Sequence, residues 1–352
     1  MPLSPLKIPQ LAVAANVINY NTAALTLRCV KALLATDVVR ILVLDNASEA
    51  ADRATLVSGL DELAAAKGRV ECFISDQNLG FAGGSNRLIA ASLADPSITH
   101  CFLINSDSFI DSAGFALFVR QVSKGNADLW GARVHQDRDG VAVCDQAQVE
   151  SMGIALYRPL LASNRKHAYE TFVGPTGGCA LYSRKVLEDL LSTHGYCFDP
   201  DYFCYAEDTD LCLRAHLLGY CVAYCDEGVA WHLGQASSGG SFNDFVYYHG
   251  IRNSIWTIIK CVPASVLFRN LGWIFLLHLG IVVRHSLRGK MILTFQIYRD
   301  VCFGLGSIIR KRKVVQSSRR SPVDCINKLI TPRFYEYAYL RKAIKQLFFR
   351  SA

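Results

Sequence analysis

Short apolar runs alternate with longer, more polar segments along the first part of the chain. The apolar runs at 11–20, 41–46, 70–75, 99–105 and 127–134 have the length and composition of buried strands. The segments between these runs are long enough for helices, and Thr22 and Asp111 stand where helices would begin. Strands that alternate with helices at this spacing predict βαβ units. We therefore expect an α/β fold with a mostly parallel, Rossmann-like sheet flanked by helices.

Polar residues follow several of these predicted strands at the point where each strand ends. They are Asn19, Asp45, Asn46, Asn105 and Asp107. Ligands of parallel α/β sheets bind beyond the carboxyl ends of the strands, so these side chains are expected to line one shared cleft. The competing interpretation, that each residue only begins a loop, is weaker for five residues than for any one alone.

A glycine-rich segment at 78–86 follows the third predicted strand. Its glycine spacing differs from the dinucleotide-binding pattern G-x-G-x-x-G, and it does not follow the first strand. Gly80 and Gly83 would let the backbone approach a ligand closely. Asn78 and Asn86 offer uncharged donors and acceptors suited to a base or a sugar. By itself this motif is weak.

Two short acidic motifs are the candidate chemical centre. Asn105, Ser106 and Asp107 follow a buried strand, where oxygen side chains suit a hard divalent cation that also binds substrate phosphates. A turn that ends the strand would explain them equally simply. Glu207 and Asp208 precede a predicted helix, where the helix dipole favours an ionised carboxylate that can act as a general base. Simple N-capping is the alternative there, but a cap does not need two acids.

His232 ends another strand-like run and precedes a glycine- and serine-rich loop at 234–240. A neutral imidazole at this point could be a further metal ligand, and the loop could close over a substrate. A lone histidine is more often a structural hydrogen-bonding group. The sequence leaves both roles for His232 open.

Composition divides the chain into an acidic body and a basic, apolar C-terminal region. The 352 residues carry a net charge of +7, but from residue 252 onward 19 Lys and Arg face 3 Asp and Glu, a net of 19 − 3 = +16. The apolar run at 271–283 is shorter than the roughly 18 residues of a spanning helix, so a core or interfacial helix is expected. The basic clusters at 310–313 and 319–320 suit an anionic membrane surface. Nucleic acid is the rival partner, but no recognition fold surrounds these residues.

These patterns predict an N-terminal tail at 1–10, a main domain at 11–250 and a C-terminal helical, basic region at 251–352. The 13 cysteines are odd in number and mostly lie in apolar runs, which favours buried reduced thiols. Together with the lack of a signal-peptide pattern, this predicts a cytoplasmic protein, peripheral on the inner face of the cell membrane. The oligomeric state is left open, with a homo-oligomer as one alternative.

The ordered set of motifs resembles the family-2 inverting glycosyltransferases with the GT-A fold, especially bacterial rhamnosyltransferase-like members. The similarity extends over roughly residues 10–260. Each motif is loose, but their order is specific. The matching segments lie at 17–21, 43–48, 78–84, 103–107, 177–181, 198–199, 203–214, 232–234 and 252–253.

The resemblance implies roles for individual residues. Asp208 would be the catalytic base, and Glu207 would orient the donor or the acceptor. Asp107 would hold Mg²⁺ or Mn²⁺ through the D-x-D element of the family, with help from His232, although Asn105 replaces its first acid. The nucleotide-sugar would contact Asn19, Tyr20, Asp45, Asn78, Gly80, Gly83, Asn86, Asn105 and Gly178.

The implied activity is transfer of a sugar, rhamnose from dTDP-rhamnose first of all, to a saccharide or polyprenyl-linked acceptor in surface polysaccharide synthesis. A UDP-hexose transferase of the same fold is the nearest alternative. A non-catalytic scaffold that binds glycan or lipid carrier is an alternative of another class, disfavoured because Asp107, Glu207 and Asp208 are all present. A nicotinamide dehydrogenase is disfavoured by the glycine spacing.

Overall fold

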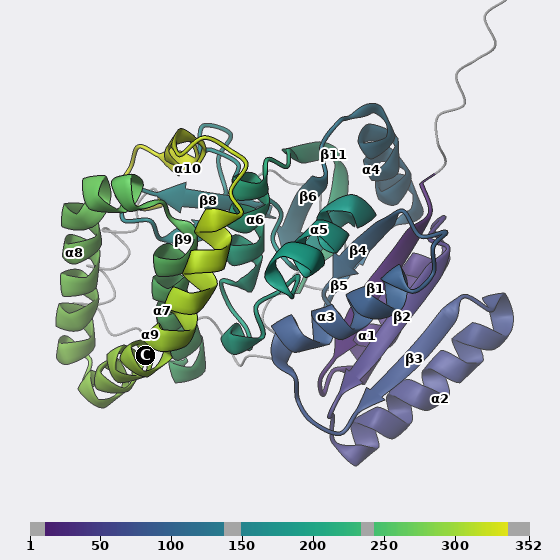
Figure 1. Ribbon diagram of the computed structural model, residues 1–352. Helices are drawn as coiled ribbons and strands as arrows, with labels where there is room; N and C mark the ends of the chain where they lie inside the picture. The colour runs from purple at the N-terminus through teal and green to yellow at the C-terminus, as the bar shows by residue number, and fades with distance from the viewer. Residues whose placement is uncertain (1–10, 137–148, 234–242, 337–352) are drawn as a thin grey trace, which may run out of the picture.

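The computed structural model describes residues 11–136, 149–233 and 243–336. The predicted N-terminal tail at 1–10 and the loop at 234–240 lie outside these ranges. Within them the chain forms a mixed sheet with helices on both faces, and a group of C-terminal helices beside one edge of it (Figure 1).

The first part of the chain follows the predicted alternation closely. Its strands β1, β2, β3 and β4 pair in parallel in the order β3-β2-β1-β4. Nearly every position of β1 and β2 is buried, which explains their apolar sequences. The elements are β1 (Val13–Asn19), α1 (Ala23–Leu34), β2 (Arg40–Asn46), α2 (Ala50–Lys67), β3 (Val70–Ser75), α3 (Gly80–Leu93) and β4 (His100–Ile104).

The second part of the sheet is mostly antiparallel. Strand β10 lies between β4 and β6 and runs opposite to both, and β11 pairs in parallel with β6 and antiparallel with β5. The α/β prediction is confirmed, and the parallel pairing is confined to β3-β2-β1-β4 and β6-β11. The elements are β5 (Ser108–Ile110), α4 (Ser112–Lys124), β6 (Leu129–Gln136), β7 (Val149–Ser151), β10 (Cys179–Ser183), α5 (Arg184–His194), η2 (Pro200–Tyr202), α6 (Glu207–Leu218) and β11 (Val222–His232).

Two large apolar clusters fill the two faces of the sheet. Helices α1, α2 and α4 cover one cluster, and α3, α5 and α6 contribute to the other. Every cysteine in the described part of the chain is free, and most of these thiols are buried, as their apolar surroundings predict. A separate small sheet joins β8 (Ile154–Tyr157) to β9 (Ala162–Asn164) and to β12 (Ile330–Thr331) near the C-terminus.

The C-terminal region is helical, as predicted, but more of it is apolar than the sequence pattern indicated. It contains α7 (Asp244–Cys261), α8 (Ala264–Leu287), α9 (Met291–Ser317) and the short α10 (Asp324–Lys328). Helix α8 is 24 residues long, so it extends well beyond the apolar run at 271–283, and α9 was not foreseen as an apolar helix. By length and composition, both are long enough to cross a membrane. Helix α7 passes through residue 250, where the domain boundary was expected, and that division stays a prediction.

A buried ionic cluster joins this helical region to the sheet domain. The ammonium group of Lys260 on α7 contacts the carboxylates of Asp199 and Asp210, and all three side chains are fully buried. Asp210 lies on α6 and also binds the buried guanidinium of Arg214, at 2.8 Å. Burial by itself would raise the pKa of Asp210, but Arg214 and Lys260 hold it below its ordinary value. Lys311 from α9 completes the cluster through Asp199.

Replacement of Lys260 by methionine is expected to lower the free energy of unfolding by up to about 3–5 kcal/mol, because it removes the one cation that contacts both carboxylates. Asp199 would then keep only Lys311 as a charged partner in the cluster, and Asp210 only Arg214. Urea unfolding followed by circular dichroism measures the loss. Lys290 pairs with Asp244 at the surface, so Lys290→Met is the matched control and should cost less than about 1 kcal/mol. Equal losses in the two variants would contradict the importance given to the buried cluster.

Candidate active site

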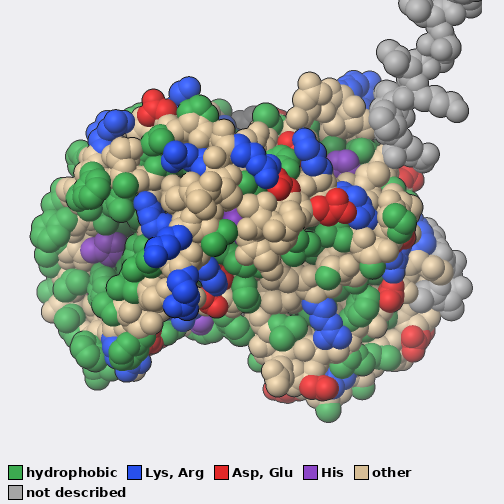
Figure 2. All heavy atoms as spheres, in the orientation of Figure 1, with side chains coloured by type: hydrophobic (Ala, Val, Ile, Leu, Met, Phe, Trp, Pro, Cys, Tyr) green, Lys and Arg blue, Asp and Glu red, His purple; other side chains and the backbone are tan. Residues whose placement is uncertain are grey.

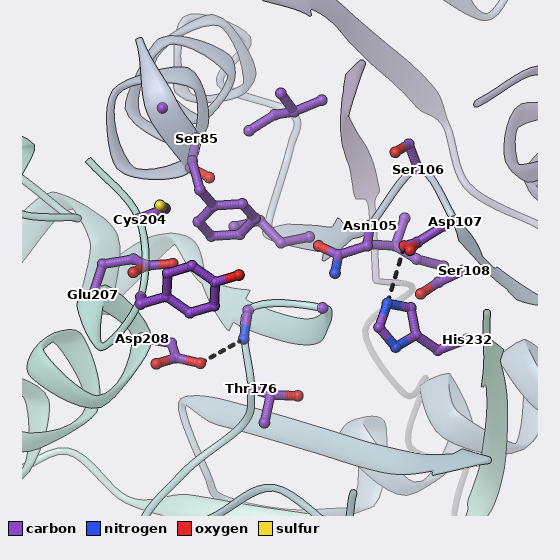
Figure 3. Close-up of a pocket in the computed structure, with 18 of the residues that line it drawn as sticks. Ser85, Asn105, Ser106, Asp107, Ser108, Thr176, Cys204, Glu207, Asp208 and His232 are labelled. Atoms are coloured by element: carbon purple, nitrogen blue, oxygen red, sulfur yellow. Dashed lines mark hydrogen bonds and ion pairs between the residues drawn. The ribbon is translucent and has the colours of Figure 1, made fainter. Parts of the chain in front are cut away.

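A cavity of about 380 Å³ opens at the carboxyl ends of β1, β2 and β4. The α3 amino terminus, the start of α6 and the end of β11 close its sides. Figure 3 shows Asp107 and His232 on one side of it and Glu207 and Asp208 on the other. The two acidic motifs, about 100 residues apart in the sequence, therefore face one another across a single space.

Two strand residues, His232 and Glu150, and Asp107 in the turn between β4 and β5 form a chain of ionic contacts on the first side. The Nε2 atom of His232, at the end of β11, lies 3.0 Å from a carboxylate oxygen of Asp107. Its Nδ1 atom lies 2.9 Å from Glu150 on β7. Burial lowers the pKa of His232, but its hydrogen bonds to the two carboxylates outweigh burial and raise the pKa to about 10. Without a cation, His232 is therefore protonated at neutral pH and bridges Asp107 and Glu150.

The same three residues provide a test of whether a divalent cation fits here. Over the ranges that the structure describes, no three His, Cys, Asp or Glu side chains are grouped so that they could hold a metal ion. Asp107 and His232 Nε2 nevertheless offer one oxygen and one nitrogen ligand to the cavity. Glu150 binds the other ring nitrogen, an arrangement that orients many metal-binding histidines. Two protein ligands are enough for a cation that takes its remaining ligands from phosphates and water.

On the opposite side, Asp208 and Glu207 begin helix α6. The backbone N–H of Gly177 donates to Asp208 at 3.1 Å, and that of Thr209 donates to it at 2.6 Å. Burial raises the pKa of Asp208 above its ordinary value, although these hydrogen bonds oppose the shift. Asp208 is thus a half-buried carboxylate, oriented by backbone donors, at the edge of the cavity.

Glu207 differs from its neighbour in having an oxygen, Oε2, that is buried and lacks a hydrogen-bond partner in the described part of the chain. Burial, followed by repulsion from Asp208, raises the pKa of Glu207 well above its ordinary value. The raised pKa favours the protonated form of this carboxyl group, which can donate a hydrogen bond. Neighbouring carboxyl groups whose surroundings differ can take different protonation states, as a catalytic acid and base require.

The backbone that leads into this pair is strained. Phe203, Tyr205 and Ala206 all have positive φ angles, between 65° and 68°. Phe203, with φ 65° and ψ −65°, is the centre of a tight turn in which the N–H of Cys204 donates to the carbonyl of Tyr202 at 2.8 Å. Such conformations cost on the order of 1–3 kcal/mol each and persist where surrounding contacts enforce them.

The structure places the predicted nucleotide-sugar residues in two groups. One group lines the cavity together with the candidate catalytic and metal residues: Tyr20, Asn78, Gly80, Asn105 and Gly178. The other group, Asn19, Asp45, Gly83 and Asn86, is absent from its lining. The contacts of both groups with a nucleotide-sugar stay predictions.

Asn19 and Asp45 are fully buried and occupied by contacts within the protein. The amide of Asn19 donates to Asp45, to Ser48 and to Asp52, at distances of 2.9–3.2 Å. Asp45 also forms an ion pair of 2.7 Å with Arg53. These contacts connect the ends of β1 and β2 to the start of α2, just beside the cavity.

The remaining predicted residues have identifiable structural constraints. A Cβ atom on Gly80, whose φ is +66°, would lie 2.3 Å from the carbonyl oxygen of Phe203, so only glycine lets α3 approach the strained segment. At Gly83 a Cβ atom would meet Leu79 at 2.9 Å. The side chain of Asn86 binds both the N–H and the carbonyl of Phe198, at 2.9 and 2.7 Å. Asn86 thus attaches α3 to the segment that leads into α6.

Several cavity residues were not identified from the sequence. Glu150 has no recognisable motif around it in the sequence. Phe203, Tyr205 and Phe245 form edge-to-face aromatic contacts beside Glu207 and Asp208. Phe203 and Tyr205 lie within the matching segment at 203–214, so their position could have been anticipated. Phe245 lies on α7 and reaches the cavity only through tertiary packing.

Comparison with known proteins agrees with this fold. The model of the glycosyltransferase-like family 2 matches residues 9–245, more than half of the chain, and the chain belongs to that family. No curated protein sequence matches it.

Solved structures extend the comparison to the C-terminal helices. S. aureus TarS 1-349, in complex with UDP-GlcNAc, has a TM-score of 0.54 at 13% identity, over 94% of this chain and 92% of that one. The mannosyltransferase PcManGT from Pyrobaculum calidifontis, in complex with GDP-Man and Mn²⁺, has a TM-score of 0.52 at 14% identity, over 88% and 87%. GalNAc-T7 with UDP, GalNAc and Mn²⁺ gives 0.52 at 14%, over 72% of this chain and 48% of that longer one. At these identities the likeness shows the GT-A fold.

Proposed function

We propose that this protein transfers a sugar from a metal-bound nucleotide-sugar to an acceptor hydroxyl group, with inversion at the anomeric carbon. The observation that carries the proposal is the arrangement of one cavity, in which Asp208 faces Asp107 and His232. A base on one side and a candidate cation site on the other are the two parts that this reaction requires. The motif resemblance and the family membership support the same reaction.

The donor diphosphate is assigned to the side of Asp107 and His232. A bound Mg²⁺ or Mn²⁺ would supply positive charge that stabilises the departing nucleoside diphosphate. Asp107 and His232 would hold that ion, and Glu150 would orient the imidazole through Nδ1. The structures of PcManGT and GalNAc-T7, which contain Mn²⁺ and a nucleotide, give this assignment general support.

Asp208 is assigned the removal of the proton from the acceptor hydroxyl. Its carboxylate is fixed by the N–H groups of Gly177 and Thr209, which point it along the edge of the cavity. Glu207, whose raised pKa favours the protonated form, would donate a hydrogen bond to a sugar oxygen. The deprotonated acceptor then attacks the anomeric carbon from the face opposite the diphosphate, and no bond between sugar and protein is needed.

Rhamnose from dTDP-rhamnose is the first candidate donor, on the resemblance to rhamnosyltransferase-like proteins, and UDP-hexoses are the second. The proposed acceptor is a saccharide or a polyprenyl-linked saccharide of a surface polysaccharide. A non-catalytic scaffold would not require a half-buried, oriented Asp208 opposite Asp107, so the geometry favours an enzyme.

Asp208→Asn is expected to lower turnover by about 100- to 10,000-fold, because an amide cannot accept the proton. Turnover is measured as release of nucleoside diphosphate, and donor affinity by calorimetry. Since burial raises the pKa of Asp208, wild-type turnover should be lost as pH falls through a value above 3.8, the ordinary one for aspartate.

Asp111→Asn provides the matched control. Asp111 caps α4 by accepting from Gly114 at 2.6 Å, and asparagine caps a helix equally well. Normal turnover of Asp208→Asn, with the donor still bound, would exclude Asp208 as the base.

We further propose that the protein is held at the membrane by helices α8 and α9. Their exposed side chains include Phe268, Phe275, Phe295 and Phe303, each between 66% and 80% exposed. Figure 2 shows hydrophobic side chains over the outer edge of the molecule that α8 forms, with lysine and arginine nearby. Burial of such a phenylalanine is worth roughly 1.5–3 kcal/mol, so a few of them suffice for interfacial binding.

Three of the six residues in the basic clusters at 310–313 and 319–320 contact groups within the protein. Lys311 contacts Asp199 and Asp201, and Arg320 pairs with Asp189. Arg312 donates to backbone carbonyl groups at the end of α7. The proposed membrane contact is therefore mainly apolar, and high salt should not release the protein from the membrane.

Flotation with vesicles of phosphatidylglycerol and phosphatidylcholine tests this proposal. The wild-type protein should float and stay bound in 1 M salt, and the double variant Phe268→Ser/Phe275→Ser should remain in solution. Ile74→Ser is the control, since Ile74 is an exposed apolar residue of the sheet domain. Release of the wild type by salt alone, or equal flotation of the double variant, would contradict an apolar contact through α8.

A further inference from the structure

A single asparagine on α7 is in contact with most of the strained segment before Glu207. The side-chain nitrogen of Asn253 donates to the carbonyl groups of Tyr202, Cys204 and Tyr205, at 2.9, 2.8 and 2.8 Å. An amide nitrogen has two hydrogens, so the three acceptors share them. Asn253 is fully buried and does not line the cavity.

The orientation of this amide is determined by its partners. All three groups around the nitrogen are carbonyl oxygens, which can only accept. The oxygen of Asn253 in turn accepts from Nε of Arg252, at 2.9 Å. Arg252 also donates to the carbonyl groups of Asp201 and Tyr202, at 3.3 Å, and stacks over Trp256. Arg252 therefore fixes the amide oxygen of Asn253, while the amide nitrogen binds the segment before Glu207.

The carbonyl groups that Asn253 binds belong to the residues that define the tight turn. Tyr202 and Cys204 flank Phe203, the residue at its centre, and Tyr205 is the next residue with a positive φ. Each of the three carbonyl groups comes directly before a residue with a positive φ angle, and this local conformation lets all three accept from the amide on α7. A relaxed backbone would turn them away from α7 and move the start of α6.

We propose that Asn253 is a positioning residue, which sets the location of Glu207 and Asp208 by holding residues 202–206, three of which have positive φ angles, in their strained conformation. The inference rests on the proposed function, because it assigns those two carboxyl groups the catalytic task. By this inference, turnover depends on a residue outside the cavity. Helix α7 then helps to position the candidate catalytic carboxyl groups.

The substitution that tests this most sharply is N253D, which keeps the shape but turns three donor contacts into oxygen facing oxygen. N253A removes the donors without adding repulsion. If N253D does not fold, N253A alone tests whether Asn253 holds the segment. N270D is the matched control, since Asn270 is a buried asparagine of α8 whose amide donates to one helix carbonyl, at 2.8 Å from Val266.

Hydrogen–deuterium exchange and turnover are measured on each folded variant. We expect exchange in residues 199–212 to become at least about tenfold faster in N253D and N253A, and to stay unchanged in N270D. Nucleoside diphosphate release from UDP-, GDP- and dTDP-sugars with Mn²⁺ should fall at least about 100-fold, as small misplacements of reacting groups do. Affinity for UDP, GDP or dTDP with Mn²⁺ should change less than about threefold, because Asn253 lies outside the cavity.

Unchanged exchange in residues 199–212 of both Asn253 variants would overturn the inference. Near-normal turnover in a variant whose exchange is accelerated would also overturn the inference. The position of Asp208 would then not depend on the hydrogen bonds of Asn253. If the wild-type protein releases no diphosphate from any donor, the proposed function fails by itself, and the exchange measurement still decides whether Asn253 holds the segment.

Discussion

The ionic cluster of Lys260, Asp199 and Asp210 is the interaction on which the rest of this structure depends. Three fully buried charges from α7, α6 and the segment before it cannot be separated without leaving a charge in an apolar interior. The cluster therefore fixes α7 against α6 in one arrangement. Since α6 begins with Glu207 and Asp208, the position of the candidate catalytic carboxyl groups follows from an interaction that lies behind them.

This constraint explains why strained backbone can persist next to the cavity. Asn253 lies two helical turns before Lys260 on the same helix α7, and it reaches the left-handed residues directly. Gly80 permits α3 to approach Phe203 from the other side. The energy stored in the turn is thus offset by contacts from two helices and one buried ionic cluster, and the result is a precise location for Asp208.

Much of the sheet domain could be predicted from the sequence because its signals are local. The apolar runs became β1, β2, β3 and β4, and Asp107, His232, Glu207 and Asp208 all reach one cavity, as strand-end and helix-start positions suggested. The metal and catalytic roles of these residues remain predictions. What periodicity alone could not supply was β10, whose antiparallel place between β4 and β6 depends on pairing between distant strands.

The features that the sequence did not reveal depend on long-range contacts. Basic residues such as Lys311 and Arg320 suggested a membrane surface, but their partners, Asp199 and Asp189, lie more than 100 residues away and could not be foreseen. The extent of α8 was underestimated because polar residues such as Asn270 and His285 are accommodated by packing and hydrogen bonds within the helical region. Glu150 acquires its importance only through His232, 82 residues further along.

The central claim is that a cation held by Asp107 and His232 and a base at Asp208 act on one nucleotide-sugar. Its most direct test is nucleoside diphosphate release from a panel of UDP-, GDP- and dTDP-sugars by the wild-type protein and by Asp107→Asn, each with Mn²⁺ and with a chelator. The account predicts release from a particular donor by the wild type with Mn²⁺, and loss of that release on chelation and in Asp107→Asn. Release from no donor, or release that neither chelation nor Asp107→Asn diminishes, would contradict it.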